Sequence, residues 1–311
     1  MRWMVVVALM GSWACGAGSS TSALTPSADA REGEPDGSSA DAATDGPPDA
    51  SPEDARVSDA APADEVAADP CAALTSSFVP VASPSDPPFG GTLFLTPDIL
   101  TGDDPTSFVG LTFKGQAERV MFDRRIAAFA TFTPYLFEAR YGAATVVEVQ
   151  VNPEFTREQA EAEALRYAEP LGRVPAFYFR DLETMWIHAG DELAGGGNNN
   201  ILIHTGGGEG YIRDGLLEEL YLHEGAHTSL DAYHAAAPDW LAAQQADGGF
   251  LSDYGRDYPE REDVAESIGP YLAVRYFRDR LDPELVATIE AVMPNRIRYF
   301  DCQELSVERV R

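Results

Sequence analysis

The feature that most constrains this chain is the pentapeptide His223-Glu224-Gly225-Ala226-His227, in which two histidines stand four residues apart. On an α-helix, residues at this spacing lie on one face, one turn above each other. Both imidazoles can then bind one zinc ion, while Glu224 reaches a water molecule on the same metal. The pattern predicts a helix from near Gly215 to about Leu230 with both histidines on its inward stripe. The same stripe contains Leu216, Leu220 and Leu230.

A third metal ligand is expected elsewhere in the chain, because catalytic zinc sites have three protein ligands and one open position. Glu262 and Glu266 are the best candidates, since they lie one helical turn apart and share a face. Apolar Val264 and Ala265 flank the pair, so we expect a partly buried face rather than a solvated acidic one. A buried carboxylate pair needs a cation to offset its desolvation. We therefore predict that Glu262 binds zinc and that Glu266 hydrogen-bonds a ligating imidazole.

Other histidines and acids lie close to these motifs in the sequence. His234 does not fall at the position of the third histidine in metzincins, so we expect it beside the site rather than on the metal. Asp231, one turn after His227, is a candidate hydrogen-bond partner for that imidazole. His188 and His204 lie in predicted strands, where they are either extra metal ligands or, as we expect, buried strand histidines.

Three separated motifs resemble one known family. Leu222–His227, then Tyr254-Gly255-Arg256, then Glu262–Glu266 are similar, in this order, to the catalytic domain of anthrax lethal factor-like metalloproteases. These are zincins of the gluzincin branch, whose third ligand is a helical glutamate. The resemblance covers roughly residues 180 to 270. Its departures are a longer interval before Glu262, and Asp263-Val264 where the family has a hydrophobic pair.

The resemblance implies an α+β, zincin-like fold, in which a small mixed sheet packs on the motif helix and on a C-terminal helix that carries the glutamate. It further implies that the zinc ligands are His223, His227 and Glu262. Glu224 would be the general base, Tyr254 would donate a hydrogen bond to the oxyanion, and Glu266 would support a ligating histidine. Nothing in residues 71 to 150 matches the family.

These observations predict a zinc metallopeptidase, a hydrolase with one zinc ion per chain and a peptide or protein substrate. Zinc would activate a water, and Glu224 would take its proton and deliver it to the leaving amine. The predicted strand Ile201–Thr205 would form the upper edge of the cleft and pair with an extended peptide. Two alternatives stay open. One is a non-catalytic surface lipoprotein that zinc only stabilises, with His234 as a fourth ligand, and the other is a zinc hydrolase acting on a non-peptide amide.

Periodicity predicts several elements around the motifs. Alternating residues over 135–152 indicate a β-hairpin, and Thr156 with Gln159 forms a capping box for a helix to about Glu169. Strands are expected at 184–188 and 201–205, with an irregular Gly/Asn turn over 195–200 between them. A last long helix is expected from about Pro259 to Arg280, kinked at Pro270.

The N-terminal part predicts export from a bacterial cell. Arg2 precedes a short apolar run and small residues, so residues 1–15 are expected to be a lipoprotein-type signal peptide with Cys15 as the lipidation site. Ordinary signal cleavage, giving a secreted protein, is the alternative. Residues 16–70 are rich in Ala, Ser, Pro and Asp without aromatics, which predicts a disordered acidic linker. The protein would then be lipid-anchored to the cell envelope.

Residues 71–311 form the expected globular, metallopeptidase-like domain. The chain has 51 acidic residues against 22 Lys and Arg, which argues against nucleic acid as a partner. We expect a monomer that contacts the membrane only through its lipid. Cys71 and Cys302, at opposite ends of this domain, are expected either to form a disulfide or to remain free thiols.

Overall fold

The computed structural model describes residues 71, 73–82, 86–97, 99–305 and 307. The predictions for the signal peptide, for Cys15 and for the acidic linker therefore lie outside the described residues. Within the described part, no helix combines the length and the apolar character needed to cross a membrane.

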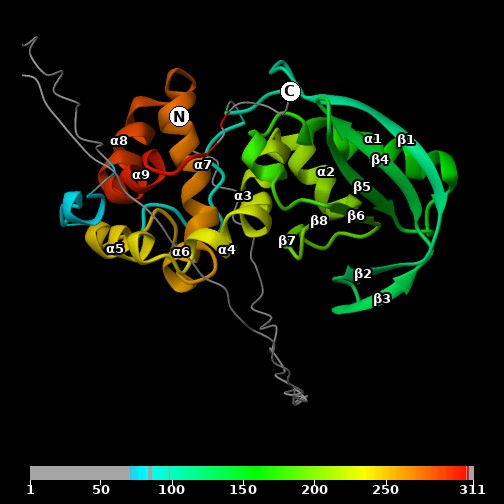
Figure 1. The fold of residues 1–311 in the computed structure, drawn as a ribbon, viewed down its shortest axis with the longest axis horizontal. Helices are drawn as coiled ribbons and strands as arrows, with labels where there is room; N and C mark the ends of the chain where they lie inside the picture. The colour runs from blue at the N-terminus through cyan, green and yellow to red at the C-terminus, as the bar shows by residue number, and fades with distance from the viewer. Residues whose placement is uncertain (1–70, 72, 83–85, 98, 306, 308–311) are drawn as a thin grey trace, which may run out of the picture. The chain divides into compact units, whose positions relative to one another are not determined.

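A six-stranded mixed sheet forms one half of the domain (Figure 1). Its spatial order is β1 (Phe108–Gln116), β4 (Tyr135–Tyr141), β5 (Thr145–Val151), β6 (Thr184–His188), β8 (Asn200–His204) and β7 (Gly195–Gly197). The β1-β4-β5 strands are antiparallel, β5-β6-β8 are parallel, and β7 runs antiparallel to β8. A separate hairpin consists of β2 (Arg119–Asp123) and β3 (Ala128–Phe132). The expected α+β class is confirmed.

Local sequence signals explain two of the confirmed elements. The predicted hairpin is β4–β5, and its inward residues Phe137, Ala139 and Val147 are fully buried. Helix α1 (Arg157–Leu171) begins with the predicted capping box, in which Thr156 and Gln159 satisfy each other's backbone N–H groups.

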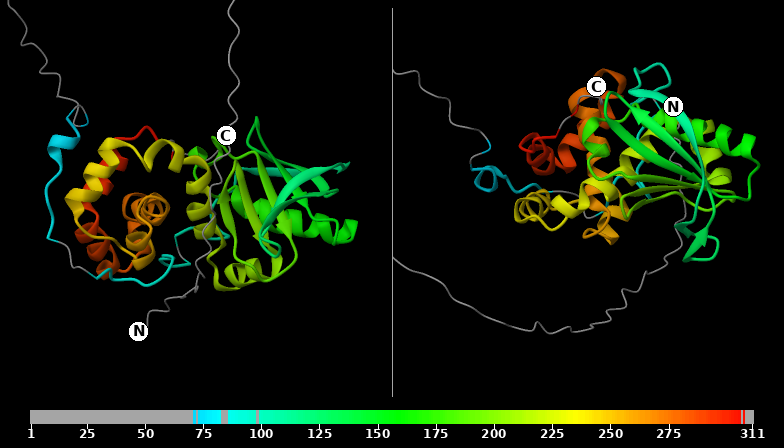
Figure 2. Two further views of the ribbon diagram at one scale, coloured as in Figure 1. Left: turned by 90° about the horizontal axis from the view of Figure 1, so that it is seen from below. Right: turned by 45° about the vertical axis from the view of Figure 1, so that its right-hand side comes forward.

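The remaining helices lie mostly after β8 in the sequence, and only η1 and η2 precede it. They are η1 (Thr75–Ser77), η2 (Ala176–Phe179), α2 (Thr205–Asp214), α3 (Leu217–Ser229), α4 (Asp231–His234), α5 (Pro238–Asp247), α6 (Asp253–Asp257), α7 (Asp263–Tyr276), η3 (Arg278–Arg280), α8 (Pro283–Val292) and α9 (Pro294–Asp301). Helix α3 contacts β7 and β8 on one side and α7 on the other. Figure 2 shows the resulting order, with the sheet on one side of α3 and α5, α7, α8 and α9 on the other.

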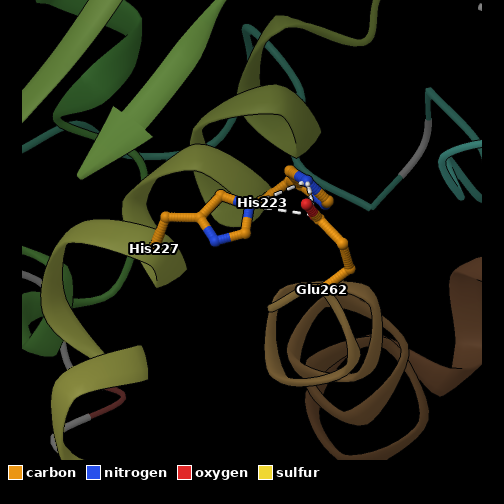
Figure 3. Close-up of side chains that lie close together, drawn as sticks. All are labelled: His223, His227 and Glu262. Atoms are coloured by element: carbon orange, nitrogen blue, oxygen red, sulfur yellow. Dashed lines mark hydrogen bonds and ion pairs between the residues drawn. The ribbon is translucent and has the colours of Figure 1, made fainter. Parts of the chain in front are cut away.

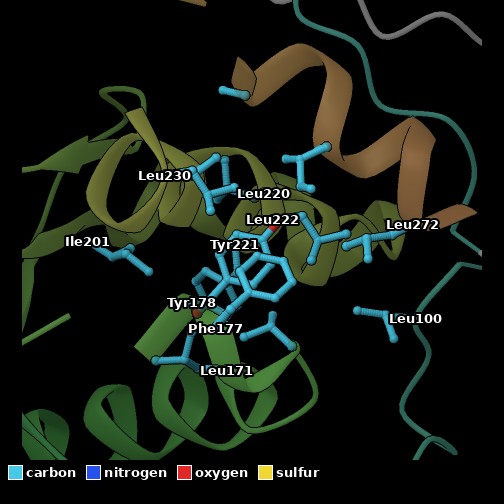
Figure 4. Close-up of a cluster of buried hydrophobic side chains, with 14 of the residues drawn as sticks. Leu100, Leu171, Phe177, Tyr178, Ile201, Leu220, Tyr221, Leu222, Leu230 and Leu272 are labelled. Carbon is cyan, nitrogen blue, oxygen red and sulfur yellow. The ribbon is translucent and has the colours of Figure 1, made fainter. Parts of the chain in front are cut away.

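The two faces of the sheet have different neighbours. Ile187, Ile201 and Ile203 point into the main core, which surrounds α3 (Figure 4). Trp186 and Leu202 point the other way and pack with residues of the β2–β3 hairpin in a second, smaller cluster. The strands are therefore buried on both faces at their centre.

Helix α2 lies between β8 and the motif helix in the sequence. Two expectations about this region are corrected. Residues 195–197, expected in a turn, form the edge strand β7, and only Asn198 and Asn199 turn the chain, both at positive φ. Because β8 is paired on both sides, it cannot be the open edge of a cleft, and β7 holds that position.

The last long helix is also shorter than expected. Helix α7 begins at Asp263 rather than near Pro259, with Glu262 as its N-cap residue, and it ends at Tyr276. Pro270 lies inside it, as expected. At the ends of the domain Cys71 and Cys302 form a disulfide, with their Cα atoms 5.5 Å apart.

Candidate metal centre

Helix α3 is buried on nearly all sides, which fixes the position of its motif. Its first turn is held by Glu218, which pairs with Arg173 at 3.0 Å. The next residue, Glu219, accepts hydrogen bonds from the backbone N–H groups of Leu95 (2.6 Å) and Thr96 (3.0 Å). Burial raises the pKa of Glu219 to about 8. The sequence predicted that only one stripe of this helix is buried. The structure buries residues on all its faces, because α3 is a central helix rather than a surface one.

The structure brings the three predicted metal ligands together (Figure 3). His223 Nε2 and His227 Nε2 lie 3.3 Å apart. Glu262 Oε2 lies 3.6 Å from the first of these nitrogens and 3.2 Å from the second. Zinc bonds of about 2.0–2.1 Å in a tetrahedral arrangement separate neighbouring ligand atoms by about 3.4 Å. The three atoms therefore fit one zinc ion with little rearrangement.

Burial of these groups supports the same fit. His223 is 5% exposed and Glu262 is 4% exposed. Glu262 Oε2 is buried and has no hydrogen-bond partner among the residues that the structure describes. A carboxylate oxygen in this position is costly to leave without a donor or a cation. The donor set, two imidazole nitrogens and one carboxylate oxygen, is one that zinc prefers.

The charges at this point are strongly coupled. Burial works to raise the pKa of Glu262, but the imidazoles of His223 and His227 outweigh it and hold that pKa well below its usual range. Burial likewise works to lower the pKa of both histidines, yet nearby carboxylates raise each of them above the usual value, through Glu262 at His223 and through Asp231 and Glu262 at His227. Without metal, the raised pKa values favour protonated imidazoles at His223 and His227, at the position where a divalent cation fits between the three side chains.

Acidic side chains contact the other nitrogen of each histidine. Asp231 Oδ2 lies 2.8 Å from His227 Nδ1, and Glu266 Oε1 lies 3.5 Å from His223 Nδ1. Contacts of this kind fix the orientation of ligating imidazoles. Asp231 is thus within hydrogen-bond distance of its imidazole, whereas Glu266 reaches only ion-pair distance, and His223 Nδ1 has no hydrogen-bond partner among the described residues.

Ser252 is a residue that the sequence reasoning missed. It is the N-cap residue of α6, so its Oγ accepts a hydrogen bond from Gly255 N, and it donates to Glu266 Oε2 at 2.6 Å. The backbone N–H of Leu93 donates to the same oxygen at 3.0 Å. Ser252 thereby links the turn that carries Tyr254 to the carboxylate behind His223. A Ser followed by Asp before a short helix is its only local signal.

The second oxygen of Glu262 also has defined partners. Tyr254 Oη donates to Glu262 Oε1 at 2.9 Å, and Arg261 Nη2 donates to the same atom at 3.0 Å. Tyr254, expected to donate to an oxyanion, here donates to the candidate metal ligand Glu262. Burial and the Glu262 charge both raise the pKa of this phenol, so it remains a donor at neutral pH.

Glu224 lies beside the ligands and the edge strand. It is 4% exposed, and its charge contributes to raising the pKa of His223, His227 and Tyr254. A Cβ atom built on Gly196 of β7 would lie 1.9 Å from the Glu224 carbonyl oxygen, so the strand and the helix are in backbone contact here.

Thr228 ties the same strand to α3. Its Oγ1 accepts from Gly197 N at 2.9 Å and donates to Asn200 O at 2.7 Å, which connects both ends of the β7–β8 turn to the helix. No sequence signal indicated this contact.

Three other histidines do not join the centre. His234 Nδ1 contacts Tyr299 Oη at 2.7 Å, away from the ligand atoms. His188 and His204 stack with ring centroids 5.3 Å apart next to Asp123, under the β2–β3 hairpin. Among the described residues, His223, His227 and Glu262 are the one group of three that could hold a metal ion.

Asp263, the aspartate between Glu262 and Glu266, pairs with an arginine of the C-terminal helices. Asp263 is 2% exposed and forms a buried ion pair with Arg296 of α9, and it accepts a hydrogen bond from Gln244 at 2.9 Å. Arg296 also pairs with Asp247 at 2.9 Å. Asp263 therefore anchors the start of α7, directly after Glu262, to the C-terminal helices.

Comparison with known proteins identifies no family, relative or similar structure for this chain. No protein-family profile matches the chain, and no curated protein and no solved structure matches it. The geometry of the site itself is therefore what any functional conclusion rests on.

Proposed function

We propose that this chain is a zinc-dependent metallopeptidase with a zincin-like fold. The observation that carries the proposal is the triangle of His223 Nε2, His227 Nε2 and Glu262 Oε2, with separations of 3.2–3.6 Å, beside a buried glutamate on the same helix. Three ligands leave one position open, which is the arrangement of a catalytic rather than a structural zinc site. The position of His234 on Tyr299 argues against a fourth protein ligand from that residue.

Each residue around the proposed zinc site has a separate role in peptide hydrolysis. A bound zinc ion would polarise a water molecule and the scissile carbonyl group. Glu224 accepts the proton of the attacking water and returns it to the leaving amine. Asp231 and Glu266 orient the two imidazoles. Tyr254 orients Glu262, and it reaches a substrate oxyanion only if its 2.9 Å hydrogen bond to that carboxylate opens.

The edge strand β7 is the proposed position of the substrate backbone. It is the last strand of the sheet, so one of its edges pairs with no other strand among the described residues. Its central residue Gly196 brings the backbone against Glu224, and a peptide added to this edge would lie next to the general base. This assignment replaces the strand Ile201–Thr205, which the sequence had indicated.

We also propose that the protein works outside the reducing cytoplasm. The Cys71–Cys302 disulfide supports this, because such bonds persist mainly in oxidising compartments. Export and lipid attachment through Cys15 remain proposals from the sequence alone.

The proposed activity can be tested with the purified, zinc-loaded protein and its Glu224→Ala variant. Cleavage of a peptide library should be seen with the wild type and should be lost with the variant, while both retain zinc. A wild type that binds zinc but cleaves no peptide would contradict the proposal. A Glu224→Ala variant with full activity would remove Glu224 from the mechanism.

A further inference from the structure

An exposed arginine lies against the first residue of the edge strand. Arg124 belongs to the turn between β2 and β3, and its Nη2 donates a hydrogen bond to the carbonyl oxygen of Ala194 at 2.7 Å. A Cβ atom built on Gly195 would lie 2.7 Å from the same nitrogen. The guanidinium group therefore rests directly on the backbone where β7 begins.

The partners of Arg124 differ from those of the arginine beside it. Arg125 makes hydrogen bonds to both oxygens of Asp123 and pairs with Glu154 at 2.7 Å. Arg124, by contrast, has no carboxylate within ion-pair distance in the described part of the chain. The carbonyl of Ala194 occupies one of the five N–H donors of the guanidinium. In a chain with 51 acidic and 22 basic residues, this leaves a cation available to a ligand.

Arg124 and Glu224 contact neighbouring residues of the edge strand. The neighbouring Gly196 is in backbone contact with Glu224. Burial raises the pKa of Tyr211 to about 12, the Glu224 carboxylate adds to this rise, and the Arg124 guanidinium opposes it. Both charges therefore act on one phenol, which lies on α2. The cation and the general base flank the same short strand.

We propose that Arg124 selects an acidic side chain of the substrate at a position near the scissile bond. The inference rests on the proposed peptidase function, because it needs a peptide along β7. The glycines of β7 supply no side chains for recognition, and Arg124 places a positive charge next to a peptide on this edge. A guanidinium binds a carboxylate through two parallel hydrogen bonds, which gives both attraction and geometry. The net charge of −29 repels acidic ligands in general, so acceptance of one requires a local cation of this kind.

The test compares peptides that differ only in Glu, Gln or Lys at single positions on either side of the scissile bond. Cleavage is measured as kcat/KM with the zinc-loaded wild type, and binding is measured by fluorescence anisotropy with the inactive Glu224→Gln variant. At one position, Glu should exceed Gln by about 10- to 100-fold, the range for a hydrogen bond to a charged group.

Variants of Arg124 decide whether it causes the preference. Arg124→Gln should bring the Glu/Gln ratio close to one, and Arg124→Glu should favour Lys at the same position. Arg140→Gln is the control, because Arg140, in strand β4, is also exposed and has no carboxylate at ion-pair distance among the described residues. It should keep the wild-type ratio. Thermal melting of all variants checks that the fold is intact.

Failure of this inference differs from failure of the proposed function. Cleavage without an acidic preference at any position, or a preference that persists in Arg124→Gln, overturns the role of Arg124 and leaves the peptidase standing. If the wild type cleaves no peptide, the proposed function fails. The ratio of Glu-peptide to Gln-peptide binding then decides whether Arg124 recognises an acidic side chain. Equal binding of Glu and Gln peptides then overturns the role of Arg124, and an acidic preference lost in Arg124→Gln sustains it.

Discussion

Replacing Gly196 by alanine is expected to separate metal binding from catalysis. The added Cβ atom would lie 1.9 Å from the Glu224 carbonyl oxygen, whereas ordinary contacts of this kind begin at 3.4 Å. Strand β7 and helix α3 must therefore move apart by about 1.5 Å. Overpacking of this kind costs about 1–3 kcal/mol. For a domain of this size, that cost lowers the melting temperature by about 2–12 °C.

The assay for Gly196→Ala combines thermal melting, zinc content and peptide cleavage. Zinc should be retained, because the ligand side chains come from α3 and from the start of α7 rather than from β7. Cleavage should fall by about 100-fold, since a displacement of about 1 Å has this effect on a positioned reaction. Gly110→Ala is the control: Gly110 lies in β1, and its Cβ would meet nothing within 4 Å. A Gly196→Ala protein with unchanged melting and activity would refute the close packing of β7 on Glu224.

Three further predictions concern the metal centre and its support. Asp231→Ala should weaken zinc binding by about 10- to 100-fold in a chelator competition, because it removes the acceptor for His227 Nδ1; unchanged affinity would exclude this role. Because the pKa of both motif histidines is raised, their contribution to the stability of the metal-free protein is complete below about pH 6.5 and is lost at higher pH. Zinc affinity should instead increase with pH as the competing protons leave. The stabilisation by zinc, measured as the difference in melting temperature with zinc and with chelator, should therefore increase with pH. Arg296→Met should cost about 3–5 kcal/mol in denaturant unfolding, because Asp247 and Asp263 are left buried without their cation; a change below 1 kcal/mol would show that the network is not held by charge.

Local signals account for the parts of the fold that could be predicted. The capping box at Thr156, the alternation in β4–β5 and the four-residue histidine spacing each act within one turn or one hairpin. The two glutamates of the last motif could be paired with the histidines because their apolar neighbours indicated a buried face, and both are at most 4% exposed.

The errors fall where tertiary packing overrides local preference. The glycines at 206–208 disfavour a helix, at about 1 kcal/mol each relative to alanine, yet they lie in α2. Close neighbours explain their presence: a Cβ on Gly206 would lie 2.0 Å from Asp191, and one on Gly208 would lie 2.4 Å from Tyr167. Similarly, Gly196 is in a strand because the backbone of α3 approaches it.

The supporting contacts of the site were beyond local reasoning for another reason. Ser252 and Leu93 contact Glu266 from segments 14 and 173 residues away. Such pairs have no periodic signature, and a single sequence offers no way to join them. The resemblance to gluzincins named the ligands but could not indicate that Tyr254 contacts Glu262 or that Asp263 pairs with Arg296.

The central claim is that one zinc ion is held by two imidazoles of α3 and by Glu262. The most direct measurement is zinc affinity by competition with a chromophoric chelator, combined with zinc content by mass spectrometry. The wild type should bind one zinc per chain, and Glu262→Ala should lose at least about 100-fold in affinity. Glu219→Gln, which changes a buried glutamate on the same helix with a pKa of about 8, should bind zinc like the wild type. A wild type without zinc, or a Glu262→Ala protein that binds it equally tightly, would contradict the account.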